Sequence, residues 1–160
     1  MDGKLTEYAI TFFLSFLPIS ELRGAIPYGI LSQRLPLHCV LVLSLIGNFL
    51  PVVPVYLGIQ QWARCLSRNR LAKRFFDWVF ARTRRQAKSI QYSEFFGLAI
   101  FVGVPLPMTG AWTGAILGSL LGISPRRGIP AILLGILIAA GVVTGVCLGV
   151  ITVFDFFIKR

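Results

Sequence analysis

Two charged side chains interrupt the apolar stretch 8–33, and their types suit proton transfer and anion binding. Glu21 and Arg23 are the only formal charges within the apolar segments of the chain, away from their ends. A charge at membrane depth costs about 2.5–3.5 kcal/mol on insertion scales, so such a residue marks a transport pathway or proton relay by default. Burial opposes ionisation of a carboxylate whereas a nearby guanidinium favours it, and arginine can hold a phosphate or carboxylate. The alternative interpretation is a buried structural ion pair.

Helix-breaking residues surround this pair. Pro18, Gly24 and Pro27 bracket it in the string PISELRGAIP. Residues two apart on a regular helix do not face each other, so Glu21 and Arg23 cannot pair along one helix. We therefore expect a break that lets the two charges meet or points both into one cavity.

A second Pro/Gly motif, PLPMTGAWTGA at 105–115, supplies hydroxyls and freed backbone. Pro105 and Pro107 disrupt a helix, and Thr109, Trp112 and Thr113 follow them. Hydroxyls and free N–H groups at the start of a half-helix can bind an anion. The alternative is a proline kink whose freed backbone groups are satisfied by the threonine hydroxyls.

The elements that carry these motifs are apolar segments. The chain has 160 residues, of which 56% are hydrophobic and 14% charged, whereas soluble domains carry about 25% charged residues. This composition excludes a disordered chain and argues against an ordinary soluble enzyme. We expect one all-α integral membrane domain over 1–160, with a first repeat at 8–59, a basic linker at 60–93 and a second repeat at 94–158.

Segment lengths favour hairpins over simple spans. Residues 37–59 fit one transmembrane helix, kinked by Pro51 and Pro54. The uncharged run 95–125 would make a helix of about 46 Å, longer than the hydrocarbon core of about 30 Å. A re-entrant or broken helical hairpin is therefore expected in each repeat. Two re-entrant hairpins would make the halves inverted, whereas two pairs of full spans would make them parallel.

The linker carries nine of the sixteen basic residues of a chain with a formal charge of +10. Aromatic and aliphatic residues alternate with the bases, which predicts an amphipathic helix at the membrane surface that contacts anionic lipid headgroups. A plain positive-inside topological anchor is the alternative, and both place 60–93 in the cytoplasm of a multi-pass protein in the cell (inner or plasma) membrane. Nucleic acid is not an expected partner.

Residues typical of metal sites and catalysis are sparse. His38 is the single histidine, and Cys39, Cys65 and Cys147 lie far apart. No zinc-ligand spacing, catalytic triad or P-loop motif is present, so we expect no metal, no cofactor, no enzymatic activity and no direct use of ATP.

Glycines recur every four residues in two places, which is typical of closely packed membrane helices. These predicted packing glycines also suggest a homo-oligomer, most simply a dimer. The ladders are Gly110, Gly114, Gly118 and Gly122, and Gly141, Gly145 and Gly149.

The strings ISELRGAIPYGI and PLPMTGAWTGA resemble the small multidrug export protein family of bacteria and archaea, over essentially the whole chain. That family in turn looks related to the DedA-like membrane proteins. The resemblance implies two opposed re-entrant hairpins and movement of lipids such as polyprenyl phosphates. It also implies that Glu21, Arg23, Gly24 and Pro27 form the first hairpin motif, and Pro105, Pro107, Thr109 and Gly110 the second. Unlike the DedA-like pattern, the second hairpin here carries no charge.

Three functions follow from these features. The first is a proton-coupled carrier or flippase for amphipathic or lipid-phosphate substrates, with its site between the hairpins. The second is a small multidrug exporter of organic cations, for which a Glu-only site would suffice. The third is a membrane assembly protein without transport, in which Glu21 and Arg23 are structural.

Overall fold

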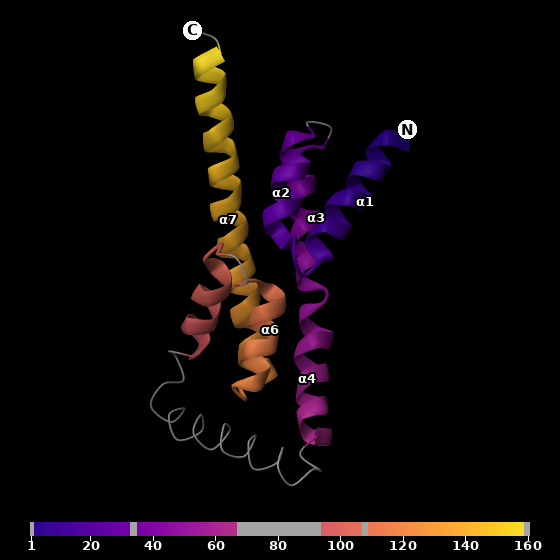
Figure 1. Ribbon diagram of the computed structural model, residues 1–160, viewed down its shortest axis with the longest axis vertical. Helices are drawn as coiled ribbons and strands as arrows, with labels where there is room; N and C mark the ends of the chain where they lie inside the picture. Colours follow the sequence, from indigo (N-terminus) through magenta and orange to yellow (C-terminus); the bar gives the residue numbers. More distant parts are fainter. Residues whose placement is uncertain (1, 33–34, 67–93, 107–108, 159–160) are drawn as a thin grey trace.

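The computed structural model describes residues 2–32, 35–66, 94–106 and 109–158, and all of the regular structure in these ranges is helical. Each apolar segment except the last is divided into two helices (Figure 1). The helices are α1 (Asp2–Phe16), α2 (Glu21–Leu31), α3 (Leu37–Phe49), α4 (Val52–Leu66), an unlabelled helix Glu94–Gly103, α6 (Ala111–Leu120) and α7 (Pro125–Ile158).

The first apolar segment folds into a hairpin of α1 and α2. The helices pack on each other, and the Tyr28 hydroxyl donates to Glu7 Oε2 at 2.8 Å. The break occupies the residues around Pro18, immediately before Glu21. Gly24 and Pro27 lie inside α2, so the expectation that they also break the helix is wrong. Gly24 instead makes room for Ser20, whose hydroxyl a Cβ would overlap.

The third apolar segment forms the second hairpin. Its arms are the helix Glu94–Gly103 and α6, separated by a non-helical stretch that contains Pro105. A Cβ at Gly114 would overlap Val102, and one at Gly118 would meet Leu98, so the two arms are antiparallel. Pro107 lies outside the described residues.

The second and fourth segments supply the longer helices. The stretch Leu37–Ile59 is apolar enough to cross a membrane, and its helix is interrupted at Leu50 and Pro51, between α3 and α4. The predicted disruption by proline is confirmed at Pro51, whereas Pro54 lies inside α4 without interrupting it. In the fourth segment, α7 is continuous, and Pro125–Thr152 is the second candidate span.

The core lies where the second hairpin meets α4 and α7. Its largest fully buried side chain is Tyr56, whose hydroxyl donates to the Ile123 carbonyl at 2.8 Å. Ser119 in turn donates to the Tyr56 carbonyl at 3.1 Å. These bonds fix the far end of α6 against α4 and leave its first turn to form the site.

Apart from Gly110, the glycines of the two ladders divide into three roles. Gly114 and Gly118 pack closely, as predicted. Gly122 does not: with φ of 72° it terminates α6, and the Ile123 N–H reaches the Gly118 carbonyl at 3.1 Å, as in a Schellman cap. Three further glycines face open space. The prediction that they pack against another helix is therefore wrong within a single chain. They are Gly141, Gly145 and Gly149.

The close face of α7 uses other glycines. A Cβ at Gly128 would overlap the Tyr56 ring, and one at Gly135 would meet Val102. These positions are seven residues apart, with Ala131 buried between them. A four-residue spacing rule therefore misses them.

The basic linker is described only up to Leu66 at the end of α4. The predicted amphipathic helix within 60–93 falls largely on residues 67–93, which lie outside the described residues. It stays a prediction.

Candidate functional site

The two hairpins meet at their tips. The Trp112 indole N–H, in the first turn of α6, donates to the Phe16 carbonyl at 3.0 Å. The rings of the same two residues form an edge-to-face pair with centroids 6.1 Å apart. Phe16 ends α1, where carbonyls lack helical partners, so the indole caps one hairpin from the other.

Glu21 binds the start of α6. Its carboxylate accepts the backbone N–H groups of Ala111 and Trp112, each at 3.3 Å. These are among the N–H groups that a helix leaves unpaired at its N-terminus, where the helix dipole also favours negative charge. The sequence predicted that the start of this half-helix binds an anion. The anion found there is the Glu21 carboxylate.

Glu21 also has an unusual backbone conformation. Its φ is 48°, the only positive value among the described non-glycine residues. A non-glycine residue in this region is uncommon and such strain often accompanies function. The turn after Pro18 thereby directs the carboxylate out of α2 and towards the second hairpin.

Gly110 makes this approach possible. A Cβ at this position would overlap the Glu21 carboxylate. The residue is the N-cap of α6 and has an extended backbone, with φ of −123°. Its role is therefore space for the carboxylate rather than helix packing, although the sequence placed it in both groups.

Arg23 binds carbonyl groups of the second tip. Nη1 donates to the Leu106 carbonyl, and Nη2 donates to the Thr109 carbonyl at 2.6 Å. Nη2 also lies 3.2 Å from the Thr109 hydroxyl. The break near Pro105 frees these carbonyls from helical bonding, and the planar guanidinium, with five donors, satisfies them.

The Thr109 hydroxyl ties the tip together. It lies 2.9 Å from the carbonyls of both Val104 and Leu106. A threonine hydroxyl thus repairs the proline break, as one interpretation of the sequence expected, and the same residue is an Arg23 partner. Thr109 thus fits the repair interpretation, whereas the anion at this helix start, Glu21, is bound by the backbone N–H groups that open α6.

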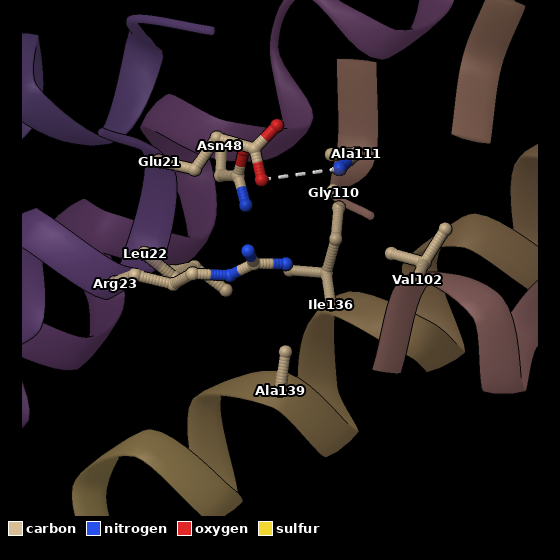
Figure 2. A pocket seen from close by; sticks show the side chains of 9 residues that line it. All are labelled: Glu21, Leu22, Arg23, Asn48, Val102, Gly110, Ala111, Ile136 and Ala139. Atoms are coloured by element: carbon tan, nitrogen blue, oxygen red, sulfur yellow. Dashed lines mark hydrogen bonds between the residues drawn. The ribbon is translucent and has the colours of Figure 1, made fainter. Parts of the chain in front are cut away.

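The two charges do not form an ion pair with each other in the described structure; each binds the opposite hairpin. They line one pocket instead, which was the second of the two expected outcomes (Figure 2). The pocket has room for about one water molecule. Its other lining residues are Leu22, Asn48, Val102, Gly110, Ala111, Ile136 and Ala139.

Several sequence candidates lie outside the pocket lining. Gly24 and Pro27 are in α2, Pro105 is in the tip, and Thr113 is in the first turn of α6. Conversely, Asn48 lines the pocket, although an amide in a candidate span by itself indicates no more than an interhelical hydrogen bond. Its position as an isolated amide in the uncharged run 37–59 was the available signal.

Outward-facing apolar side chains define the class of protein. Ile19 is 98% exposed, and Phe13 and Val146 are each more than half exposed. Soluble proteins rarely expose contiguous apolar surface of this kind. With two candidate spans and an all-helical described structure, these faces indicate a small integral membrane protein with a charged internal site.

The family follows from comparison with known proteins. Residues 21–143 match the model of the family described as "Putative small multi-drug export protein". The match covers more than half of the chain, so the chain belongs to this family. Comparisons with curated proteins and with solved structures give no match.

Proposed function

We propose that this protein is a proton-coupled carrier or flippase of the cell membrane that moves amphipathic molecules with an anionic, lipid-phosphate-like headgroup. The observation that carries the proposal is the position of the Glu21 carboxylate. It occupies the N–H groups that open α6, beside the Arg23 guanidinium. An anionic headgroup needs the same donors, so substrate and carboxylate compete for them.

Protonation resolves this competition. Neutral Glu21 no longer competes as an anion for the N–H groups of Ala111 and Trp112, and Arg23 keeps its charge. An anionic headgroup then takes the place of the carboxylate, with Arg23 as its counter-ion. When Glu21 loses its proton, the carboxylate returns and expels the substrate. A proton and a negative charge enter together, so the net charge of the pocket is preserved.

Helix lengths support a re-entrant arrangement. The helix Glu94–Gly103 and α6 each have ten residues and span about 15 Å, half of a hydrocarbon core of about 30 Å. Arms of this length bring a hairpin tip to the middle of the membrane. In Figure 1 the two hairpins approach from opposite ends. We therefore favour inverted repeats, in which α3–α4 and α7 cross the membrane and the basic linker is cytoplasmic.

The pocket is too small for a headgroup, so transport requires the hairpin tips to separate. The bonds that must break are those of Glu21, Arg23 and Trp112 to the opposite hairpin. On substrate binding, the headgroup replaces Glu21 as the acceptor for the N–H groups of α6 and replaces the tip carbonyls as the acceptor for Arg23. The relation to DedA-like proteins suggested by the sequence motifs is consistent with this reaction, which involves no covalent step.

A homodimer is the proposed assembly. On α7, Gly141 and Gly145 face open space and present a flat strip on an otherwise apolar helix. Small residues at this spacing let a second helix approach closely.

Transport and binding in reconstituted vesicles test the proposal. Glu21→Gln should still bind an anionic amphiphile but lose the pH dependence of transport. Arg23→Ala should lose binding, and Arg23→Lys should recover it only partly because lysine lacks the planar fork. Arg126→Ala, which removes an exposed arginine, is the matched control. Unchanged anion binding in Arg23→Ala contradicts the proposal.

Export of organic cations is the second candidate, favoured by the family description and by the buried carboxylate of Glu21, which is 7% exposed. Cation transport that survives Arg23→Ala and is lost in Glu21→Gln would select it. If replacing both charges leaves the cellular function intact, a non-transporting assembly role is correct instead.

A further inference from the structure

Asn48 presents an unsatisfied oxygen to the site. The residue is 2% exposed and lies on α3, near the break that precedes α4. Its Oδ1 has no hydrogen-bond partner in the described structure. Buried polar atoms are rarely left unpaired, and each exception calls for an explanation. Asn48 lines the pocket together with Glu21 and Arg23 (Figure 2).

The Asn48 oxygen is unpaired while the Glu21 carboxylate accepts its hydrogen bonds from α6. An ionised carboxylate only accepts hydrogen bonds, and Glu21 takes two from the backbone of α6. A neutral carboxyl group has an O–H that must donate. Glu21 therefore needs a new partner in its protonated form, and the N–H groups of α6 cannot provide one.

The pocket contains few candidates for that partner. Arg23 has only donors, and the side chains from α6, α7 and the helix Glu94–Gly103 that line the pocket are apolar or absent. The Asn48 oxygen is the side-chain acceptor that remains among the lining residues. Glu21 and Asn48 line the same pocket, which has room for about one water molecule. The inference therefore needs only a direct hydrogen bond between them or one bridged by a single water.

We propose that Asn48 is a positioning residue that accepts the hydrogen bond of protonated Glu21. In this state the carboxyl group leaves the start of α6 and bonds to α3, which exposes the N–H groups to an anionic headgroup. This inference rests on the proposed function, because it requires Glu21 to take up the transported proton. It adds the group that holds this proton.

No other titratable group lining the pocket competes for this role. Arg23, from α2, is the one other charged residue in the lining, and α3, α6, α7 and the helix Glu94–Gly103 contribute no titratable side chain to it. On α1, Glu7 accepts from Tyr28 and does not line the pocket. The pH response of the site is therefore assigned to Glu21, with Arg23 as a constant charge.

Infrared difference spectra of the full-length protein in lipid nanodiscs, recorded against pH, test the inference. Wild-type protein should show a protonated-carboxyl band that Glu21→Gln removes. In Asn48→Leu the band should move to higher frequency, because the O–H loses its acceptor. The proton affinity of Glu21 should fall about three- to tenfold, the net worth of a hydrogen bond. Asn48→Ser keeps an oxygen and should recover part of both changes.

Ser44→Ala is the matched control, because Ser44 is a buried, unpaired hydroxyl one turn away on the same helix. It should leave the band unchanged. A Glu21 band that is identical in Asn48→Leu and wild type, or that Ser44→Ala shifts equally, overturns the role of Asn48. The proposed function is unaffected by that outcome. The absence of any Glu21 band between acid and neutral pH overturns proton coupling, and this inference with it.

Discussion

The two hairpin tips contribute different kinds of group to one site. The first tip supplies charged side chains, Glu21 and Arg23, whereas the second supplies backbone N–H and carbonyl groups freed by its break. A side chain can change rotamer and protonation state, but backbone dipoles at a helix end are fixed. Neither half of the chain therefore forms the site alone. One half carries the charged side chains and the other the backbone groups that bind them.

Overpacking the second hairpin should have the largest effect. In Gly118→Leu the new side chain collides with Tyr56 and Leu98, so the two arms of the second hairpin can no longer pack as they do. We expect the free energy of unfolding to fall by at least about 1–3 kcal/mol, the usual cost of overpacking. We also expect the variant not to purify as a single species. Thermal unfolding and size-exclusion chromatography measure this.

Gly145→Leu is the contrasting variant, because nothing lies within 4 Å of a Cβ at that position. It should leave the unfolding temperature of a single copy unchanged and weaken self-association. If Gly118→Leu is as stable as Gly145→Leu, the close packing of Gly118 against Tyr56 and Leu98 does not stabilise the second hairpin.

Closing the space between the tips should have the next largest effect. In Gly110→Ala a methyl group displaces the Glu21 carboxylate from the start of α6, while the charges of Glu21 and Arg23 remain. We expect loss of pH-dependent transport and destabilisation of about 1–3 kcal/mol. Gly97→Ala, in the helix Glu94–Gly103, is the control, because nothing lies near its Cβ and alanine favours a helix. Equal transport in the two variants would show that the carboxylate does not use this space.

The smallest effect is expected from Trp112→Phe. This change keeps an aromatic ring beside Phe16 but removes the indole N–H that caps α1. Loss of one such bond costs about 0.5–1.5 kcal/mol. The tips should separate more readily, so transport should be faster or less dependent on pH, with substrate affinity little changed. Slower transport with unchanged stability would mean that the bond does not hold the tips together.

The sequence predicted a large part of this arrangement. A charged pair beside Pro18 and an uncharged run too long for one span were enough to predict two interrupted segments. The chemistry of the second motif as an anion-binding helix start was also predictable from Pro105 and the hydroxyls that follow. Periodicity could not show which breaker acts: Pro27 remains inside α2, because its neighbours pack well enough to retain a helix.

Contacts between distant segments were beyond the sequence pattern. Asn48 is an ordinary polar residue in a candidate span until α3 is packed against the tips. Likewise, Gly141 and Gly118 have the same spacing pattern, but only Gly118 faces a neighbouring helix in this chain. A repeat of small residues indicates that a helix can be approached closely, not that a partner is present.

Proton uptake on substrate binding is the decisive test of the exchange between the Glu21 carboxylate and an anionic substrate. Purified protein in weakly buffered nanodiscs is mixed with a short-chain anionic phospholipid near neutral pH, and the change in solution pH is recorded alongside binding. We expect uptake of a proton with each bound anion in wild type, and anion binding without proton uptake in Glu21→Gln. Saturable anion binding to the wild type that takes up no proton at any pH would contradict the exchange of the Glu21 carboxylate for substrate.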